Sequence, residues 1–361
     1  MQKQIKLAIV TGRFPEETFI ANKVAALLKY NYLITVFCSN VNQQQYRRLF
    51  ENAHNITIAV LDKKKLALYL VAHPLIFFKH KRKSILLSYL LRDEVNKLKP
   101  DIMHFEFSGI AVYYQNIFAS LNARKIISCR GTAEKVRLQI DEKLKEKYTY
   151  LFNEADAIHC VSEDMRNTIL PYCSQSEKIF VNFPSVDTAK FKRTKPYTPQ
   201  TVATILSVGR LNFQKGYLNG LLAVSELKKK GVIFRWIIVG EGKQREEIIF
   251  HIHQMQLQDF VVLAGIKNSD EIIELHQQAD IFFLPSFSEG IANVVLEAMS
   301  MEMPVVSTRC GGMDEVITHG INGLLADVYD HETLAACMFQ LMDNFELRRI
   351  MGQAARKRVL E

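Results

Sequence analysis

The sequence predicts an α/β protein made of two doubly wound, Rossmann-like domains, and three observations lead to this expectation. The chain has 361 residues, which is enough for two domains of about 150 residues each. Short β-branched runs alternate with helical patterns through both halves, as is typical of parallel βαβ units. A proline-containing segment without apolar periodicity covers residues 194–199, so we expect domains over residues 1–195 and 196–361.

The expected elements follow one another in the same order in both halves. In the first half, strands are expected at residues 5–10, 33–38, 56–60, 102–105, 125–128, 157–160 and 178–181. The helices between them include residues 18–30, 84–97, 133–152 and 163–170. In the second half, strands are expected at residues 203–208, 233–239, 261–263, 281–284, 305–307 and 323–325. Its helices are expected at residues 217–230, 243–255, 270–277, 292–299 and 331–342. Two such sheets bind ligands at the carboxyl ends of their strands, so we expect the domains to face a central cleft.

The composition excludes several classes of protein. Hydrophobic residues make up 48% and charged residues 23% of the chain, which excludes wholesale disorder. The six cysteines form no Cys-x-x-Cys pair and are expected to be reduced. The amino terminus lacks the apolar core of an export signal. The longest apolar tract, residues 66–78, has 13 residues, whereas a membrane-spanning helix needs about 20. We therefore expect a cytoplasmic protein.

The charge of the chain is unevenly distributed. Residues 1–195 carry 31 Lys and Arg against 18 Asp and Glu, whereas residues 196–361 carry 15 against 20. Basic residues cluster at 63–65 and 79–83, on both sides of the apolar tract. Residues 62–92 are therefore a candidate surface for anionic lipid at the inner face of the cell membrane. A plain solvated helix face explains the same pattern equally well. Nucleic acid is not expected as a partner, because no zinc-finger spacing or RNA-binding motif occurs.

Two glycines and two cations follow the first predicted strand of the second half. Gly209, Arg210, Lys215 and Gly216 lie on one loop that leads into a predicted helix. Glycines let the backbone approach a ligand closely, and two fixed cations suit a phosphate or diphosphate. A solvated loop with ordinary surface charges is the alternative.

A second candidate loop follows the strand predicted at residues 281–284. The helix after it begins near Ile291, so the N–H groups of Gly290, Ile291 and Ala292 are expected to be free for an anion. Glu289 and Glu297 are eight residues apart, which is about 12 Å along a helix. Paired glycosidase carboxylates lie about 5–9.5 Å apart, so these two are expected to hold different parts of one elongated ligand. Glu297 lies in an apolar stretch, where an unpaired charge is costly, and a functional role is favoured over an ion pair.

The second half resembles retaining glycosyltransferase family 4, whose members have the GT-B fold, over about residues 203–326. The stretches that carry the resemblance are 209–211 with 215–216, 238–242, 262–265, 279–286, 289–299, 304–308, 311–312 with Glu315, and 322–325.

The resemblance implies a role for each matching residue. Arg210 and Lys215 would bind the diphosphate of a UDP- or GDP-linked sugar, and Glu289 would contact the transferred sugar. Glu297 would bind the ribose hydroxyls, and the amides that follow Glu289 would serve the sugar–phosphate side. The donor-binding residues implied in this way are Gly209, Gly240, Gly265, Ile266, Gly290, Ile291, Ala292 and Glu297. Family members retain the anomeric configuration without an obligatory metal, so neither a cofactor nor a protein nucleophile is expected. No Asp-x-Asp motif occurs in the chain.

The first half carries a weaker resemblance. Residues 14–20 resemble the opening of bacterial exopolysaccharide, capsule and lipopolysaccharide transferases, without their serine and glycine pair. Arg130 stands where many members have a histidine, and it is expected to face the donor sugar or phosphate. A structural ion pair is the alternative. His104 either faces the cleft or is a satisfied core histidine. His251 and His253 do not share a helix face, so they are not expected to form a metal site.

The leading interpretation is a retaining glycosyltransferase, a hexosyltransferase, that extends a glycan or a lipid-linked acceptor in bacterial surface polysaccharide biosynthesis. Two alternatives remain: a sugar-nucleotide epimerase of the same fold, and a non-catalytic nucleotide-sugar- or glycan-binding subunit. A nicotinamide oxidoreductase is disfavoured because residues 10–14 lack the Gly-x-Gly-x-x-Gly turn. Family members usually end in a helix that crosses back to the first domain, and this sequence ends about where that helix would begin.

Overall fold

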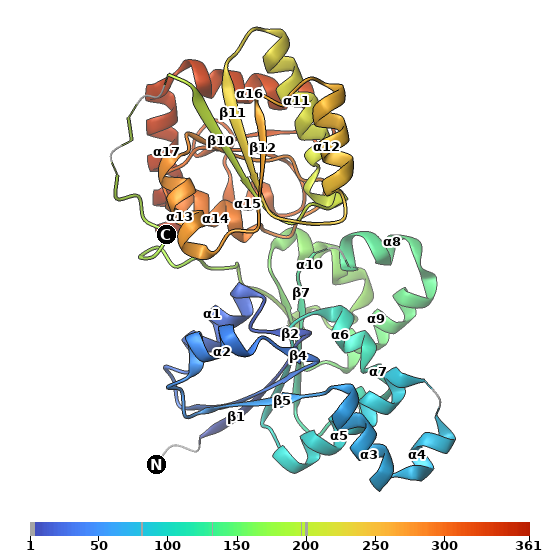
Figure 1. The fold of residues 1–361 in the computed structure, drawn as a ribbon. Helices are drawn as coiled ribbons and strands as arrows, with labels where there is room; N and C mark the ends of the chain where they lie inside the picture. The colour runs from blue at the N-terminus through green and yellow to red at the C-terminus, as the bar shows by residue number, and fades with distance from the viewer. Residues whose placement is uncertain (1–3, 81, 132, 196, 199–200) are drawn as a thin grey trace. The chain divides into compact units, whose positions relative to one another are not determined.

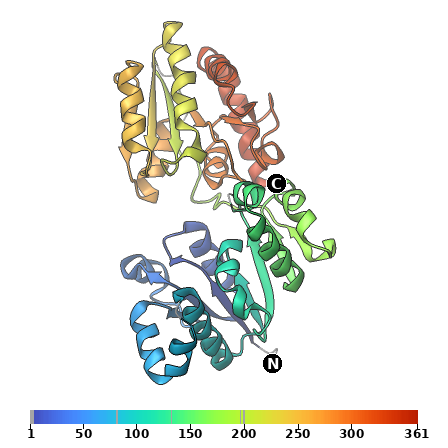
Figure 2. The ribbon, with the colours of Figure 1, turned by 90° about the vertical axis from the view of Figure 1, so that its right-hand side faces the viewer.

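The structure is a computed structural model that describes residues 4–80, 82–131, 133–195, 197–198 and 201–361, without the side chains of Phe77 and Lys79. The chain divides into two compact units, one over Met1–Val161 and Met165–Asn182, the other over Ser162–Asp164 and Phe183–Glu361 (Figure 1). In each unit, helices cover both faces of a parallel sheet (Figures 1 and 2). The predicted fold class, two Rossmann-like α/β domains, is confirmed.

The first unit is built on a seven-stranded parallel sheet with the order β5-β3-β1-β6-β7-β8-β9. Its strands are β1 (Ile5–Val10), β3 (Tyr32–Cys38), β5 (Ile56–Val60), β6 (Ile102–Phe105), β7 (Arg124–Cys129), β8 (Ala157–Cys160) and β9 (Ile179–Val181). A separate pair is formed by β2 (Arg13–Phe14) and β4 (Asn40–Val41). The helices are α1 (Thr18–Leu27), α2 (Gln43–Phe50), α3 (Lys63–Ala72), α4 (Pro74–Lys79), α5 (Lys83–Leu98), α6 (Ser108–Tyr113), α7 (Gln115–Phe118), α8 (Leu138–Ile140), α9 (Glu142–Glu154) and α10 (Glu163–Ile169).

Alternate residues of the strands supply the two cores of this unit. Leu7 and Ile9 of β1 belong to a core that includes α1, whereas Ala8 and Val10 belong to a core that includes α5 and α9. This alternation follows from the two-residue period of a strand. A sheet with helices on both faces buries both sets, so its strands have continuous apolar runs.

The second unit is built on a six-stranded parallel sheet with the order β12-β11-β10-β13-β14-β15. Its strands are β10 (Ala203–Val208), β11 (Phe234–Val239), β12 (Val261–Gly265), β13 (Ile281–Leu284), β14 (Val305–Thr308) and β15 (Gly323–Ala326). Its helices are α11 (Tyr217–Lys229), α12 (Arg245–Gln254), α13 (Ser269–Gln278), α14 (Asn293–Ser300), α15 (Met313–Val316), α16 (His331–Asp343) and α17 (Phe345–Leu360). One core includes α11, α12 and α16 around the buried Trp236, and the other includes α14 and α17.

Local side-chain caps explain where several helices begin. The Asp141 side chain accepts a hydrogen bond from Leu144 N, so α9 starts there, and the continuous helix predicted over 133–152 is interrupted. Asn268 and Glu271 form a capping box at α13. The apolar tract 66–78 is divided between α3 and α4, with Pro74 at the first position of α4.

Both sheets reverse their strand order next to the first strand. The reversal lies between β1 and β6 in the first unit and between β10 and β13 in the second. In doubly wound sheets, ligands bind beside such a switch point, outside the carboxyl ends of the strands. Each unit therefore has one preferred place for a ligand.

The second unit begins at Phe183, whereas the sequence-based division lay between residues 195 and 196. The segment before residue 196 packs on the second unit. Phe191 is buried in its core, and the Arg193 guanidinium donates hydrogen bonds to the carbonyl groups of Met301 and Gln277 at 3.0 and 3.1 Å. These contacts were not visible in the sequence, and Pro196 and Pro199 lie outside the described residues.

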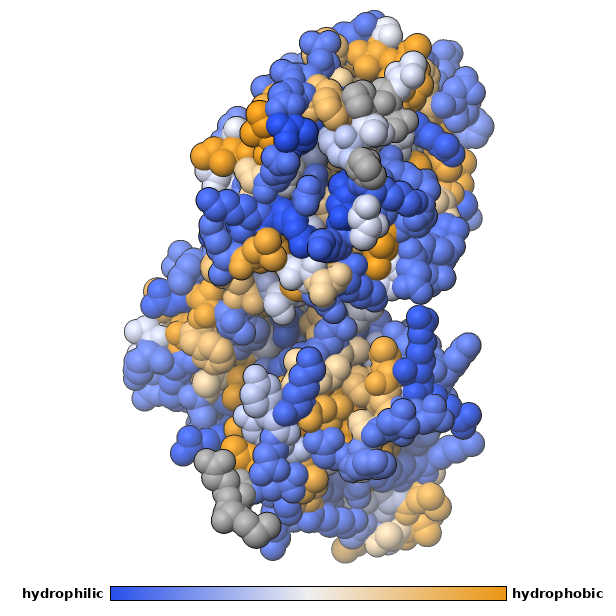
Figure 3. Space-filling view, turned by 90° about the vertical axis from the view of Figure 1, so that its left-hand side faces the viewer, coloured by the Kyte–Doolittle hydropathy of each residue, from blue (hydrophilic) through white to orange (hydrophobic). Residues whose placement is uncertain are grey.

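Most of the surface seen in Figure 3 is hydrophilic, and apolar residues are exposed in smaller areas between. All six cysteines are buried free thiols. Among the described residues, no helix is long and apolar enough to span a bilayer.

Candidate functional site

Two loops meet at the switch point of the second unit. One follows β10 and the other follows β13, and Phe287 N donates a hydrogen bond to Gln214 O at 2.7 Å. Gly216 has φ +63°, and a Cβ there would lie 1.9 Å from Pro285 O. Glycine is therefore required at this contact, because any side chain would separate the loops.

The Lys215 ammonium and the Glu289 carboxylate join these loops. Lys215 Nζ lies 2.6 Å from Glu289 Oε1, and the two side chains are 15% and 14% exposed. Ser286 Oγ donates a second hydrogen bond to the same oxygen at 2.7 Å. A Cβ on Gly209 would lie 3.1 Å from Lys215 Cε, so the lysine chain packs over a residue without a side chain. The structure thus brings together Gly209, Lys215 and Glu289, and their contacts with a donor stay predictions.

Arg210 differs from Lys215. Its side chain is exposed, and within the described part of the chain the guanidinium makes no hydrogen bond or ion pair. It remains available to an anion beside the Lys215–Glu289 pair.

The start of α14 presents free backbone N–H groups. Its N-cap residue, Ala292, provides no side-chain cap, and no acceptor in the described structure pairs with the N–H of Gly290, Ile291 or Ala292. Gly312 N donates to Gly290 O at 2.8 Å and holds the turn in place. Uncapped amides at the positive end of a helix favour an anion.

Glu297 lies on α14 and is partly buried. Burial raises the pKa of its carboxyl to about 7, although Lys190 opposes this shift. Among the residues that the structure describes, none forms a hydrogen bond or ion pair with this side chain. A partly buried carboxylate without a partner is costly, which makes it a candidate to receive hydrogen bonds from a ligand.

Three further predicted residues lie at the ends of β11 and β12. Gly240 has φ +139°, and a Cβ there would meet Gly209 O at 1.9 Å. Gly240 N donates to Gly265 O at 2.9 Å. Gly265 has φ +68°, and Ile266 after it is 78% exposed. The strand ends are therefore closely packed backbone followed by an exposed apolar side chain, and a contact with the donor base stays a prediction.

Sequence reasoning missed Tyr217, the first residue of α11. Its hydroxyl is buried and has no hydrogen-bond partner among the described residues. The hydroxyl lies 3.0 Å from the Cβ position of Gly209, and burial, with the charge of Glu289, raises its pKa. No sequence motif identified Tyr217, because the sequence alone does not distinguish it from an ordinary core residue.

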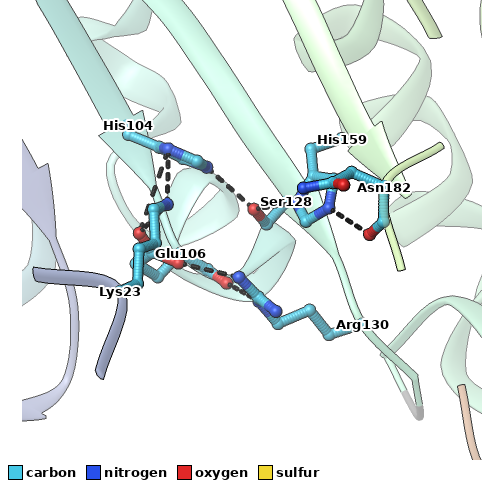
Figure 4. A network of polar contacts seen from close by, with 7 residues as sticks. All are labelled: Lys23, His104, Glu106, Ser128, Arg130, His159 and Asn182. Atoms are coloured by element: carbon cyan, nitrogen blue, oxygen red, sulfur yellow. Dashed lines mark hydrogen bonds and ion pairs between the residues drawn. The ribbon is translucent and has the colours of Figure 1, made fainter. Parts of the chain in front are cut away.

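Arg130 lies in the first unit and pairs with Glu106 (Figure 4). Arg130 Nη2 is 2.9 Å from Glu106 Oε2, and Nε donates to Glu106 O at 3.0 Å. The guanidinium lies 4.7 Å from the centre of the Phe19 ring. The structure thus contains the ion pair that was the alternative interpretation of Arg130. That Arg130 faces the donor sugar or phosphate stays a prediction.

Lys23, which the sequence did not single out, binds the other oxygen of the same carboxylate. Its Nζ lies 2.5 Å from Glu106 Oε1 and 2.9 Å from His104 Nδ1. The Glu106 side chain is fully buried. Burial alone would raise the pKa of Glu106, but His104, Lys23 and Arg130 outweigh it and hold this pKa at about 2.

His104 starts a chain of hydrogen bonds that crosses three strands (Figure 4). His104 Nε2, Ser128 Oγ and His159 Nδ1 are linked at 2.8 and 2.9 Å, and His159 Nε2 lies 3.0 Å from Asn182 O. Burial lowers the pKa of His104 to about 3 and that of His159 to about 4, so both rings are neutral at pH 7. Lys23 only donates and the Asn182 carbonyl only accepts, so each bond has one direction. His104 is therefore a satisfied core histidine.

No group of three or more His, Cys, Asp or Glu in the described residues is arranged to hold a metal ion. His253 Nδ1 instead lies 3.1 Å from Gln258 Nε2.

Comparisons with known proteins cover almost the whole chain. The family model described as "Glycosyltransferase Family 4" matches residues 17–190, and the one described as "Glycosyl transferases group 1" matches residues 188–358. The "Amylovoran biosynthesis glycosyltransferase AmsK" of Erwinia amylovora is 30% identical over 246 residues, covering 66% of this chain and 60% of that protein. The "Putative colanic acid biosynthesis glycosyltransferase WcaL" of Escherichia coli K12 is 32% identical over 219 residues, covering 58% and 54%. The alignments thus span little more than half the length of these curated relatives.

Solved structures share the fold. Anabaena Alr3699/HepE, solved in complex with UDP-glucose, has a TM-score of 0.79 at 16% identity, over 98% of this chain and 94% of that one. A glycosyltransferase from Rickettsia africae has a TM-score of 0.76 at 19% identity, over 99% and 94%.

Proposed function

Because the chain belongs to the glycosyltransferases of GT-B fold that join a family 4 domain to a group 1 domain, we propose that it transfers a sugar from a nucleotide-sugar donor. The acceptor is a glycan or a lipid-linked glycan of bacterial surface polysaccharide biosynthesis. The names of AmsK and WcaL support this setting. The UDP-glucose bound to the Anabaena neighbour supports a nucleotide-sugar donor, which here carries UDP or GDP.

The observation that carries the proposal is the group of charged and free donor atoms at the switch point of the second unit. Lys215 and Arg210 supply two permanent cations for the diphosphate, and the free N–H groups that precede α14 supply neutral donors. Charge grows on the leaving diphosphate as the sugar bond breaks. Fixed donors stabilise that charge, and each is worth on the order of 10²–10³ in rate.

The sugar end of the donor faces Glu289 in this proposal. Lys215 and Ser286 orient its carboxylate, which accepts hydrogen bonds from sugar hydroxyls rather than attacking carbon. The transfer retains the anomeric configuration without a metal ion, and a phosphate oxygen of the donor accepts the proton of the acceptor hydroxyl.

The nucleoside end faces Glu297. Ribose hydroxyls donate to its carboxylate, which has no hydrogen-bond partner in the described residues. Gly240 and Gly265 leave the strand ends without side chains, and Ile266 offers an apolar surface to the base.

A thermal-shift screen over UDP, GDP and their sugar conjugates tests the donor site. A nucleotide at 100 times its dissociation constant stabilises the folded state by about 2.7 kcal/mol. Lys215→Met is expected to reduce the shift strongly. Lys229→Met, which removes another ion-paired lysine of the second unit, is expected to leave it unchanged. If Lys215→Met binds every nucleotide as tightly as the unaltered protein does, the donor site is wrongly placed.

We also propose that α3 and α4 carry a membrane-binding surface. Leu68 and Val71 of α3 and Leu75 and Phe78 of α4 are 73–82% exposed, and within each helix the three-residue spacing places the pair on one side. Lys63, Lys64, Arg82 and Lys83 are exposed on either side of them. Apolar side chains with a basic rim suit an anionic bilayer surface. Of the basic cluster at 79–83, Lys81 and the side chain of Lys79 lie outside the described residues.

Sedimentation with vesicles containing anionic lipid tests this surface. Leu75→Asp is expected to reduce binding at low salt, and added salt is expected to reduce it further. Ile140→Asp is the matched control, since Ile140 is 80% exposed and Leu75 is 81% exposed. Equal loss for both variants, or no loss for Leu75→Asp, returns residues 62–92 to a solvated face.

A further inference from the structure

The first unit also places charged side chains at its switch point. Lys23 lies on α1, which follows β1 and the short strand β2, and Glu106 follows β6 directly. Their ion pair therefore joins segments that follow the two strands on either side of the reversal of strand order. Arg130 follows the neighbouring strand β7 and binds the same carboxylate (Figure 4). Ligands of doubly wound sheets bind at this position, and the chemistry of these residues indicates what kind of ligand fits.

Two cations share one carboxylate in this cluster and keep unused donors. Lys23 Nζ uses two of its three N–H donors, on Glu106 and His104, and Arg130 uses two of its five, both on Glu106. In the described structure, the remaining donors have no partner. The Lys23 and Arg130 side chains are 28% and 16% exposed, whereas the Glu106 side chain is completely buried. The carboxylate is thus enclosed, whereas both cationic side chains are partly exposed.

The cluster carries a net positive charge, and neighbouring side chains hold its members in place. Phe19 lies against one face of the Arg130 guanidinium, and the chain from His104 to Asn182 fixes the ring that Lys23 contacts. His104 is neutral, so Lys23, Arg130 and Glu106 together carry one net positive charge. Fixed N–H donors with excess positive charge recognise an oxyanion through charge-assisted hydrogen bonds.

We propose that Lys23 and Arg130 bind an oxyanion of the sugar acceptor, either a phosphate or a carboxylate. This proposal gives Arg130 to the acceptor, in place of the donor contact that the family resemblance implies for it. The inference rests on the proposed glycosyl transfer and specifies its acceptor as anionic. The donor diphosphate has its own cations, Arg210 and Lys215, at the switch point of the second unit. The excess of Lys and Arg in residues 1–195 favours an anionic partner for the first unit.

Protection of Lys23 from acetylation tests the site in the unaltered protein. The intact chain is treated with an acetylating reagent, with and without inorganic phosphate or glucuronate, and modification of each lysine is measured by mass spectrometry. One or both anions are expected to protect Lys23. Lys145 is the internal control, because its side chain is also 28% exposed and paired with a glutamate, and its modification is expected to stay constant. Protection by phosphate alone identifies a phosphate group, and protection by glucuronate alone identifies an acidic sugar.

Binding of the protecting anion to variants gives a second, independent measurement. With UDP or GDP saturating the donor site, calorimetry is expected to show about tenfold weaker anion binding for Lys23→Met. Lys23→Arg is expected to retain binding, and Lys145→Met is expected to match the unaltered protein. Nucleotide affinity, measured in parallel, is expected to be the same in all variants and tests the donor site separately.

Three results would overturn the proposal. The first is equal acetylation of Lys23 with and without both anions. The second is protection of Lys23 by UDP or GDP alone, which would assign the cluster to the donor. The third is a folded Lys23→Met protein that binds the anion as tightly as the unaltered protein.

Discussion

Glu297→Gln tests whether the partly buried carboxylate of α14 destabilises the folded protein until a ligand pairs with it. Burial raises the pKa of Glu297 from 4.5 to about 7. Each tenfold change in proton affinity corresponds to about 1.4 kcal/mol, so the ionised carboxylate costs the folded state about 3 kcal/mol. The folded protein binds the Glu297 proton more tightly than the unfolded chain does. The free energy of unfolding therefore has its full value below pH 4.5, and the contribution of this proton is lost as the pH rises to about 7.

The assay uses Trp236, the single tryptophan of the chain, which is fully buried in the same unit as Glu297. Urea unfolding followed by its fluorescence is measured at pH 4.5 and pH 8. Glutamine stays neutral, so Glu297→Gln is expected to be more stable than the unaltered protein at pH 8 by up to about 3 kcal/mol. The advantage is expected to vanish at pH 4.5. The same variant is expected to bind UDP or GDP about tenfold more weakly, because it loses charge-assisted hydrogen bonds.

Glu332→Gln is the control, because Glu332 is an exposed glutamate of α16 in the same unit. It is expected to bring no gain in stability at pH 8, because a carboxylate in the first turn of a helix is favourable. If Glu297→Gln behaves in the same way, the ionised Glu297 carboxylate does not lower the stability of the folded protein. If Glu297→Gln keeps full nucleotide affinity, the carboxylate does not bind ribose.

Three further outcomes are expected. Tyr217→Phe is expected to keep or increase the free energy of unfolding, because the buried Tyr217 hydroxyl has no described partner. Tyr197→Phe loses hydrogen bonds to Arg348 and Asp280, so its free energy of unfolding is expected to fall by about 1 kcal/mol. Equal losses for the two variants in urea unfolding would contradict this. Gly240→Ala is expected to lower the free energy of unfolding by more than about 3 kcal/mol, because its Cβ would meet a backbone carbonyl at 1.9 Å. Gly231→Ala, where nothing lies within 4 Å of the added Cβ, is expected to lower it by about 1 kcal/mol. A smaller loss for Gly240→Ala than for Gly231→Ala would refute the packing argument. Sugar transfer is expected to persist in EDTA, and complete loss that Mg²⁺ or Mn²⁺ restores would refute the metal-independent mechanism.

The sequence predicted the sheets more accurately than the helices. All strands of both large sheets were expected within two residues of their observed ends, because strands covered on both faces are continuous apolar runs. The short strands β2 and β4 were missed, since two-residue pairings leave no periodic pattern. The helix α17 was also missed, although Asn344 caps its first turn.

In the candidate sites, too, the sequence predicted some residues and missed others. Lys215 and Glu289 were each predicted from a local motif, and the structure shows them paired across 74 residues. Lys23 was not predicted, because it lies in no such motif and its contact with Glu106 joins residues 83 positions apart. Contacts of this kind depend on the order of the strands, which places β1 beside β6, and no local pattern encodes that order.

A structure of the protein in complex with UDP or GDP, whichever gives the larger thermal shift, tests the central claim most directly. The account predicts diphosphate oxygens within hydrogen-bond distance, about 3 Å, of Lys215 Nζ and of the N–H groups that precede α14, with ribose hydroxyls on Glu297. A nucleotide bound away from the switch point of the second unit, with Lys215 still paired only to Glu289, would contradict it.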